Sequence, residues 1–238
     1  MCRMKSMILL KDRVFCPDYD SHADMLEALK IKDDKPVPTF VKIEIVPPNG
    51  DISAPVSTWH YEPDQDRFPE WYVRDVDEKR CRDALDEWAL AHVFTNGKHE
   101  VNGGVYFALG NSTVTAWDNS TVKARDNSTV EAWDNATVTA RDNSTVKAWG
   151  SSTVKACGNS TVEAWGNATV TARDNSTVKA LDSSTVTAWG SATVEAFSNA
   201  TVTAWGNATV KALHNRSVAI KRKRYDSKPI VTFADECQ

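Results

Sequence analysis

Residues that could bind a metal or move a proton gather in the N-terminal part of the chain. Four residues of types that bind metals form a C-x-D-x-D-x-H string, made of Cys16, Asp18, Asp20 and His22. The same string suits a loop that leads into a helix, because Ser21 is a good N-cap and Asp24 follows it three residues later. We favour the loop and expect no metal site.

Two pairs of residues, His60 with Glu62 and His99 with Glu100, could perform acid–base chemistry. The sequence places no third group beside either pair, so we interpret both as solvent-exposed side chains. The chain has no G-x-S-x-G, H-E-x-x-H, P-loop or dinucleotide motif. We therefore expect a non-enzymatic protein without a cofactor. An enzyme within the N-terminal region is the alternative, and a metal bound near Cys16–His22 would reveal it.

The second half of the chain consists of an octapeptide repeat. Units such as NSTVTAWD and NSTVKARD follow one another from Asn111 to His214, and NRSVAIKR continues them in degraded form. Numbered from Asn, positions 2, 4 and 6 are Ser or Ala, Val and Ala, whereas position 5 is often charged. Such alternation is typical of a strand with one buried face, and Asp-Asn or Gly-Asn suits the turns. Stacked octads therefore predict a β-solenoid.

Charges at position 5 indicate that one coil contains two octads. In every second unit the sign alternates at a spacing of sixteen residues, through Glu131, Lys147, Glu163, Lys179, Glu195 and Lys211. Strands of neighbouring coils lie about 4.8 Å apart, so these side chains would form a ladder of opposite charges. The recurrent Asn at position 1 predicts side-chain hydrogen bonds from coil to coil at the turns.

Position 7 divides into two columns in the same way. One column is apolar throughout and consists of Trp117, Trp133, Trp149, Trp165, Leu181, Phe197 and Leu213. The other is mostly basic at first and aromatic later, through Arg125, Arg141, Cys157, Arg173, Trp189, Trp205 and Lys221. An exposed apolar column on the order of several hundred Å² is large for a monomer, and Trp is common at binding hot spots. We predict that it binds another protein or a second copy of the chain. Rings that only shield a thin core are the alternative.

The sequence predicts a mainly β fold, a two-sided β-solenoid with sixteen-residue coils preceded by a small α+β domain. We assign residues 1–102 to the α+β domain, which would also cap the first coil, 103–222 to the solenoid and 223–238 to a C-terminal cap. The N-terminal elements that we expect are a helix after Ser21, a strand at Phe40–Val46, a turn at Pro47–Asp51 and a helix at about Asp75–Val93. A basic run at Lys221–Arg224 and a last strand after Pro229 follow the repeats.

Composition narrows the setting in which the protein works. The 238 residues carry a net charge of −4, which argues against general attraction to nucleic acid. No apolar run approaches the ~20 residues that cross a bilayer, so we expect no membrane span. The stretch MCRMKSMILLKDR predicts no signal peptide, and five cysteines without a CxxC pair favour a reducing compartment. We expect a cytoplasmic location.

Two resemblances rest on quoted strings of the sequence. The octads STVTAWDN and STVKARDN are similar to repeats of bacterial ice-nucleation proteins, which are β-solenoids with sixteen-residue coils. The strings FCPDYDSHADMLEALKIKD (Phe15–Asp33) and DQDRFPEWY (Asp64–Tyr72), joined to NSTV repeats, resemble an uncharacterised family from gut bacteria and their phages. The second resemblance covers nearly the whole chain. It implies phage or mobile-element origin, where binding or sequestering a host protein would be a reasonable role.

The first resemblance implies ice binding as an alternative function. Octads with Thr-Val-Thr should share one face, at Thr137/Thr139, Thr169/Thr171, Thr185/Thr187 and Thr201/Thr203. This surface departs from ice-nucleation repeats because Lys123, Lys155 and the Arg residues interrupt it. Carbohydrate binding is a further alternative, since exposed Trp rings can stack on sugars.

Overall fold

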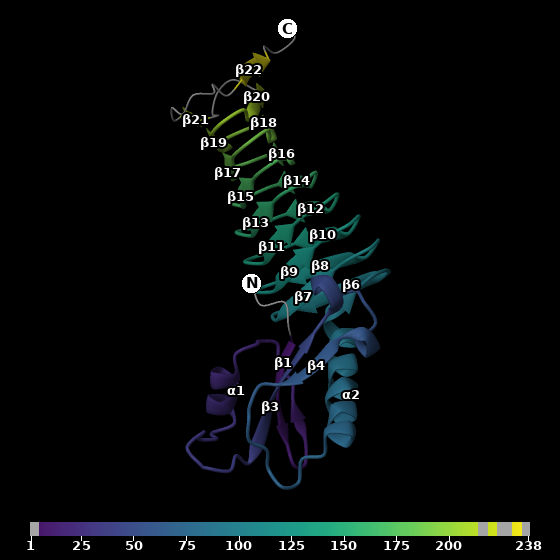
Figure 1. The fold of residues 1–238 in the computed structure, drawn as a ribbon. Helices are drawn as coiled ribbons and strands as arrows, with labels where there is room; N and C mark the ends of the chain where they lie inside the picture. Colours follow the sequence, from purple (N-terminus) through teal and green to yellow (C-terminus); the bar gives the residue numbers. More distant parts are fainter. Residues whose placement is uncertain (1–4, 214–218, 223–229, 235–238) are drawn as a thin grey trace. The chain divides into compact units, whose positions relative to one another are not determined.

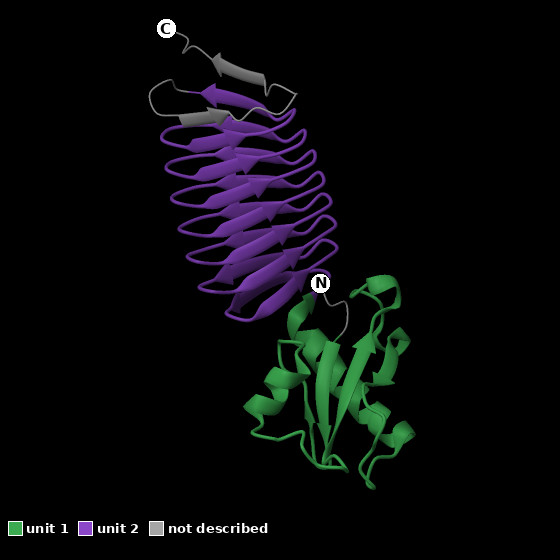
Figure 2. Ribbon diagram, turned by 60° about the vertical axis from the view of Figure 1, so that its left-hand side comes forward, with its two compact units in different colours: residues 1–93 green, residues 94–238 purple. Residues whose placement is uncertain are grey.

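The computed structural model of the chain describes residues 5–213, 219–222 and 230–234, with side chains described as far as Leu213. Figure 1 shows the order of its elements. Contacts divide it into two compact units, residues 1–93 (unit 1) and residues 94–238 (unit 2), which are coloured separately in Figure 2. A β-solenoid with a small N-terminal α+β region confirms the predicted fold class. Cys2, Cys237 and the side chains of Lys221–Arg224 lie outside this description.

Unit 1 is built on a four-stranded antiparallel sheet in the order β2-β1-β3-β4. Its elements are β1 Lys5–Leu10, β2 Val14–Phe15, α1 His22–Ala28, β3 Phe40–Val46, the single-turn helices Pro48–Gly50 and Val56–Thr58, β4 His60–Pro63 and α2 Arg74–His92. On one face of β1, Ile8 packs in a cluster with Met25 of α1. On the other face, Lys5 extends its Nζ over the Trp88 ring of α2, 5.1 Å from the centroid. Because both faces are covered, β1 is buried along most of its length.

The N-terminal elements begin close to where the sequence predicts them. Ser21 is the N-cap of α1, and its hydroxyl accepts the Asp24 N–H at 3.3 Å. The strand β3 has the predicted bounds, and the predicted turn after it contains Asn49 at φ 55°. At the start of α2 the buried Asp77 carboxylate accepts the Val73 N–H at 2.8 Å and pairs with Arg80 at 2.7 Å. These contacts satisfy a backbone donor that the first turn of a helix leaves free.

Unit 2 is a two-sided parallel solenoid of about 8 turns with roughly 16-residue coils. One sheet, here the odd sheet, contains β5 Val93–Phe94, β7 Val105–Ala108, β9 Thr121–Ala124, β11 Thr137–Ala140, β13 Thr153–Ala156, β15 Thr169–Ala172, β17 Thr185–Ala188, β19 Thr201–Ala204 and β21 Ala219–Arg222. The other, the even sheet, contains β6 Lys98–Asn102, β8 Thr113–Trp117, β10 Thr129–Ala132, β12 Thr145–Ala148, β14 Thr161–Ala164, β16 Thr177–Ala180, β18 Thr193–Ala196, β20 Thr209–Leu213 and β22 Ile230–Ala234. Figure 2 shows the coils stacked along the rod.

Small side chains form the interior of the solenoid, as the alternation predicts. Val at position 4 and Ala at position 6 are buried in every described octad from Asn111 to Leu213, and so is the Ser or Ala at position 2. From β8 to β20, each octad strand pairs in register with the octad strand sixteen residues away, for example Val130 with Val146. Main-chain bonds continue past the strand, since the Trp133 N–H donates to Ala116 O at 2.9 Å. Because the Val/Ala core is thin, the regular hydrogen bonds between the backbones of neighbouring coils provide much of the order of the solenoid.

Each turn depends on a left-handed residue at position 8. Asp118 has φ 52° and Gly150 has φ 67°, and the turn closes with a bond such as Ser120 N–H to Trp117 O at 3.1 Å. The predicted Asn ladder is wrong for the described octads, because the exposed Asn side chains at position 1 form no hydrogen bonds there. Instead, the backbone N–H of position 1 donates to the position 8 carbonyl one coil earlier, as from Asn143 to Asp126 at 3.0 Å.

The solenoid extends further toward the N-terminus than the repeat does. Strand β6, at Lys98–Asn102, pairs in parallel with β8, and unit 2 begins at Phe94. The sequence-based boundary at residue 102 therefore falls after two strands that already belong to the solenoid sheets. Parallel pairing requires extended backbone and a side chain that fits the interior, and Phe94 and Val101 meet this requirement without the octad sequence.

Candidate functional site

The apolar column lies at the ends of the even-sheet strands, on the outer side of the solenoid. Trp117 ends β8, and the other members follow β10, β12, β14, β16 and β18 or end β20. Trp117 is 37% exposed, and the remaining six side chains are partly buried. The structure therefore brings all seven predicted residues into one column.

Four tryptophans of this column stack on one another. We call Trp117, Trp133, Trp149 and Trp165 the Trp stack; successive ring centroids lie 5.3, 4.2 and 5.0 Å apart, with interplanar angles of 17°, 10° and 5°. These distances follow the spacing of the coils, so the backbone repeat sets the stacking. Each stacked pair contributes roughly 0.5–1.5 kcal/mol beyond area burial. Self-packing and partial exposure are thus both properties of this column.

A column of alternating charges runs beside the apolar column. Lys147 Nζ lies 3.8 Å from Glu131 Oε1, and Lys211 Nζ lies 3.8 Å from Glu195 Oε1. Lys179 Nζ lies 5.4 Å from the Phe197 ring centroid, so the charged and apolar columns adjoin on the same face. We call this outer surface of the even sheet the even face. Its charge column consists of Glu131, Lys147, Glu163, Lys179, Glu195 and Lys211.

The outer surface of the odd sheet, the odd face, has a different character. Trp189 and Trp205 stack at 4.7 Å, which confirms the late aromatic part of the second column. Thr-Val-Thr strands are adjacent in β15, β17 and β19, where Thr171 pairs with Thr187 and Thr187 with Thr203. Nearer the N-terminus, Lys123 and Lys155 flank Thr139 in the same row.

The N-terminal C-x-D-x-D-x-H string is divided among separate contacts. Asp20 pairs with the buried Lys5 at 2.7 Å, and Asp18 lies 2.8 Å from His92 Nε2. Burial raises the pKa of the Cys16 thiol to about 11, which keeps it protonated near neutral pH. The string leads into the capped helix α1, as the sequence analysis favours.

His22 instead meets two carboxylates that lie far away in the sequence. His22 Nδ1 lies 3.3 Å from Asp64 Oδ2, and Nε2 lies 3.1 Å from Ile43 O. One ligand atom each from His22, Glu44 and Asp64 falls within 4.8 Å of the others. Partial burial, and then the charge of Asp64, raise the pKa of Glu44. With Nε2 directed at Ile43 O, Nδ1 faces the Asp64 carboxylate, and the three side chains together could hold a divalent cation. The spacing of these residues along the sequence does not indicate the group, because α1 and the paired strands β3 and β4 bring its members together.

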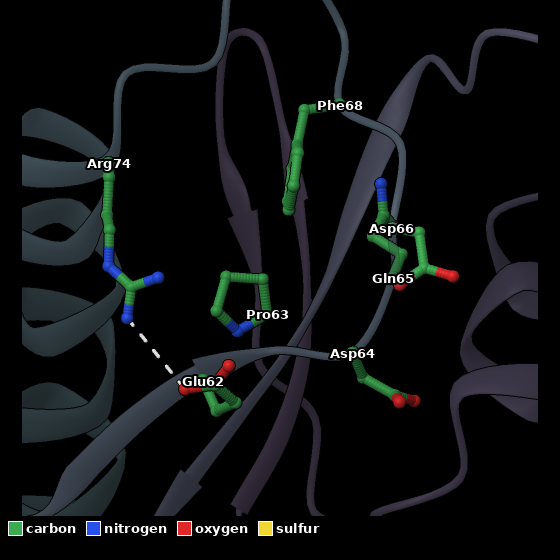
Figure 3. Close-up of a pocket in the computed structure, with 7 residues that line it drawn as sticks. All are labelled: Glu62, Pro63, Asp64, Gln65, Asp66, Phe68 and Arg74. Carbon is green, nitrogen blue, oxygen red and sulfur yellow. Dashed lines mark ion pairs between the residues drawn. The ribbon is translucent and has the colours of Figure 1, made fainter.

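An open hollow of about 430 Å³ adjoins this group in unit 1. Its lining consists of Glu62, Pro63, Asp64, Gln65, Asp66, Phe68 and Arg74 (Figure 3). Arg74 of α2 reaches toward Glu62 of β4, with Nη2 3.8 Å from Oε2. The lining thus offers carboxylates, one guanidinium and one aromatic ring.

The two histidine–glutamate pairs of the sequence analysis lie in different parts of the fold, one on β4 and one on β6. His60 Nε2 lies 3.4 Å from Glu62 Oε2, and both side chains are exposed. His99 stacks on Phe94 with centroids 3.9 Å apart, and its Nε2 lies 2.7 Å from Asn96 O. Glu62 also lines the open hollow, so the first pair lies at its edge, whereas His99 and Glu100 are not part of its lining.

Neither helix of the described chain combines the length and the apolar character that crossing a membrane requires. Comparisons with protein-family models, with curated proteins and with solved structures find no match for this chain. The even face, with its Trp stack and charge column, is therefore the candidate site on the strength of its geometry alone.

Proposed function

We propose that this chain is a non-enzymatic interaction protein, in which the solenoid is a rigid scaffold and the even face is the binding surface. The observation that carries the proposal is the Trp stack, an ordered and partly exposed row of indoles. Trp side chains supply much of the binding energy at protein interfaces. The polar edge beside the row, formed by the charge column, matches the usual arrangement of an apolar centre and a charged rim.

Preorganisation favours this use of the column. Each ring is held by its neighbours and by a backbone that is paired on both sides, so little side-chain freedom remains to be lost on binding. A partner that covers the rings would gain the remaining exposed apolar area without distorting the solenoid. The resemblance to gut-bacterial and phage proteins supports a cytoplasmic setting in which a host protein is bound or sequestered.

A triple substitution tests the proposal. Trp133→Ser, Trp149→Ser and Trp165→Ser together should abolish binding to the partner or to a second copy, as measured by affinity purification with mass spectrometry and by sedimentation. The matched control is Trp189→Ser with Trp205→Ser, which removes a stacked pair from the odd face. Both variants should keep the β-type circular dichroism spectrum. If the triple variant binds as well as the wild type and the control variant, the Trp stack serves only the solenoid itself.

Ice binding is the second candidate, and a specific observation favours it. Six Thr side chains form two rows over three adjacent strands of the odd sheet, at Thr169, Thr171, Thr185, Thr187, Thr201 and Thr203. A regular hydroxyl-bearing surface of this kind should change ice-crystal shape and produce thermal hysteresis. Thr171→Lys with Thr187→Lys would remove the effect if ice binding is correct, and its absence from the wild-type protein would exclude the idea.

A further inference from the structure

We propose that the partner of the even face is a second copy of this chain, packed face to face with its rod antiparallel to the first. This inference rests on the proposed function of the even face and adds the identity and direction of the occupant. The order of the charges carries it, with the sizes of the apolar side chains as a second observation.

The charge column is self-complementary only when one copy is reversed. In strand order it reads minus, plus, minus, plus, minus, plus from Glu131 to Lys211. The register places Thr115 before Glu131 and Thr232 after Lys211, so an uncharged position stands at each end. A reversed copy, centred between β14 and β16, places Glu131 opposite Lys211, Lys147 opposite Glu195, and Glu163 opposite Lys179. Every charge then faces the opposite sign.

A two-fold axis in the plane of this face can run along the rod or along the strands. When it runs along the rod over the charge column, the copies are parallel and each position 5 residue faces its own equivalent, so like charges meet on every coil. When it runs along the rod over the apolar column, each position 5 residue faces the uncharged Asn or Ser of the next turn, so no opposite charges meet. The axis over the charge column also sets the apolar column of one copy against the Thr column at position 3 of the other. When the axis runs along the strands, the copies are antiparallel and the apolar columns meet each other. Like charges that face each other are unfavourable, and only the antiparallel arrangement brings opposite charges together, so it is preferred.

In this antiparallel register, the two halves of the apolar column complement each other in side-chain size. Its first half carries the indoles, and its second half carries Leu181, Phe197 and Leu213. Reversal places Trp165 opposite Leu181 and Trp133 opposite Leu213, while Trp149 faces Phe197. The bulkier half of one copy thus meets the smaller half of the other, which favours close packing.

Two further observations agree with this assignment. Among the described residues, Glu163 at the centre of the column has no ion-pair partner in its own chain, and the proposed register places Lys179 of the second copy opposite it. The odd face carries Lys123 and Lys155 among Thr residues in the same row. When one copy is reversed, neither Lys therefore faces an acidic residue of that row. The self-complementary pattern therefore belongs to the even face.

Zero-length carbodiimide cross-linking of the wild-type protein tests the direction. Glu131 and Lys211 stand five coils apart, about 24 Å at the usual strand spacing, so they cannot be joined within one chain. We expect sedimentation to show a dimer and peptide mapping to find a Glu131–Lys211 link in the dimer band alone. Links between adjacent coils, such as Glu131–Lys147, should occur in both bands and serve as the internal control. A dimer without the Glu131–Lys211 link would overturn the antiparallel direction.

A charge-exchanged variant gives an independent test. The sixfold change E131K, K147E, E163K, K179E, E195K and K211E keeps net charge, composition and alternation, so its homodimer should form with a dissociation constant within about threefold of wild type. Mixed with the wild type in the same register, it meets like charges, so the mixed dimer should be weaker by about tenfold or more. A mixed dimer stronger than both homodimers would show parallel packing.

The outcomes separate this inference from the function on which it rests. A wild-type monomer at micromolar concentration would exclude a second copy as the occupant. If the Trp133, Trp149 and Trp165 variant then loses a different protein in affinity purification, the binding role of the even face survives. If no binding depends on the Trp stack, both proposals fail.

Discussion

At the scale of single residues, the cysteines differ sharply in their surroundings. Cys81 is buried, and burial raises its pKa to about 12, whereas Cys16 and Cys157 are partly exposed. Desolvation nevertheless raises the pKa of Cys16 to about 11. The thiolate is the reactive form, so a buried thiol with a raised pKa reacts slowly. Cys81 therefore has the character of a core side chain, and Cys16 is a partly exposed thiol with a raised pKa.

We expect iodoacetamide at pH 8 to label Cys157 at least about tenfold faster than Cys16 or Cys81 in the folded protein. Peptide mapping by mass spectrometry resolves each site. In guanidinium chloride the three rates should become similar, which serves as the control. Rapid labelling of Cys81 in the native protein would contradict the buried environment described for α2.

The same shifts predict how stability depends on pH. Because the folded thiols bind protons more tightly than the unfolded ones, whose pKa is near 9.0, the free energy of unfolding should fall as pH rises from about 9 to about 11. Burial also raises the pKa of Tyr61, which acts in the same direction. Urea melts at pH 8 and pH 10.5 measure the difference. Cys81→Ser should make the difference smaller, because it removes one of the thiols whose pKa is raised.

At the scale of the elements, the turns place a strict requirement on position 8. Gly150 has φ +67°, and a Cβ there would lie 3.1 Å from the Asp134 backbone nitrogen. Asp occupies the same left-handed position at Asp118, Asp134 and Asp182, so a short polar side chain is accommodated. A β-branched residue is not, because its branched carbon makes left-handed backbone costly.

We expect Gly150→Val to lower the free energy of unfolding by about 1–2 kcal/mol and Gly150→Asp to lower it by less than about half as much. Chemical denaturation with the circular dichroism signal of the sheets as probe compares the two. Gly103→Val is a matched control for steric contact, since nothing lies within 4 Å of its added Cβ and only the φ of +66° opposes it. Equal losses at Gly150 and Gly103 would attribute the whole effect to backbone conformation.

Periodic elements could be predicted from the sequence, whereas assembled contacts could not. Alternation fixed which side of each strand is buried, and the sign pattern from Glu131 to Lys211 fixed the sixteen-residue coil, because both properties repeat along one chain. The group of His22, Glu44 and Asp64 depends on α1 and the paired strands β3 and β4, which no local spacing reveals. The Asn ladder failed for a related reason. Asn is common at turns, but the hydrogen bonds between coils there join backbone groups, and at some turns an Asp carboxylate accepts a Gly N–H of the preceding coil, as Asp126 does from Gly110.

At the scale of the whole molecule, the solenoid is a sum of nearly equal coils. Each coil contacts its two neighbours through the same Val and Ala layers, so a coil can be removed with its two turns intact. The charge order does not share this tolerance. Removing one coil brings two like charges together, whereas removing two coils restores alternation.

Deletion of residues 143–158 should leave a folded solenoid but place Glu131 beside Glu163, so it should weaken the proposed dimer by about tenfold. Deletion of residues 143–174 places Glu131 beside Lys179 and should dimerise more tightly than the shorter deletion, although it buries less surface. Sedimentation equilibrium compares the two, with circular dichroism as a check on folding. A steady loss of affinity with length would show that area, and not charge order, governs association.

Interchangeable coils also create an ambiguity during folding. A chain that slips by sixteen residues keeps Val on Val and Ala on Ala, so the interior alone hardly penalises the displaced arrangement. Phe94, Val101 and Tyr106 occupy the first coils and occur in no octad. These side chains fit at only one place in the solenoid, so they can set the pairing register of every later coil. Without them, the rod would have many near-equal alignments and would assemble slowly through long-lived traps.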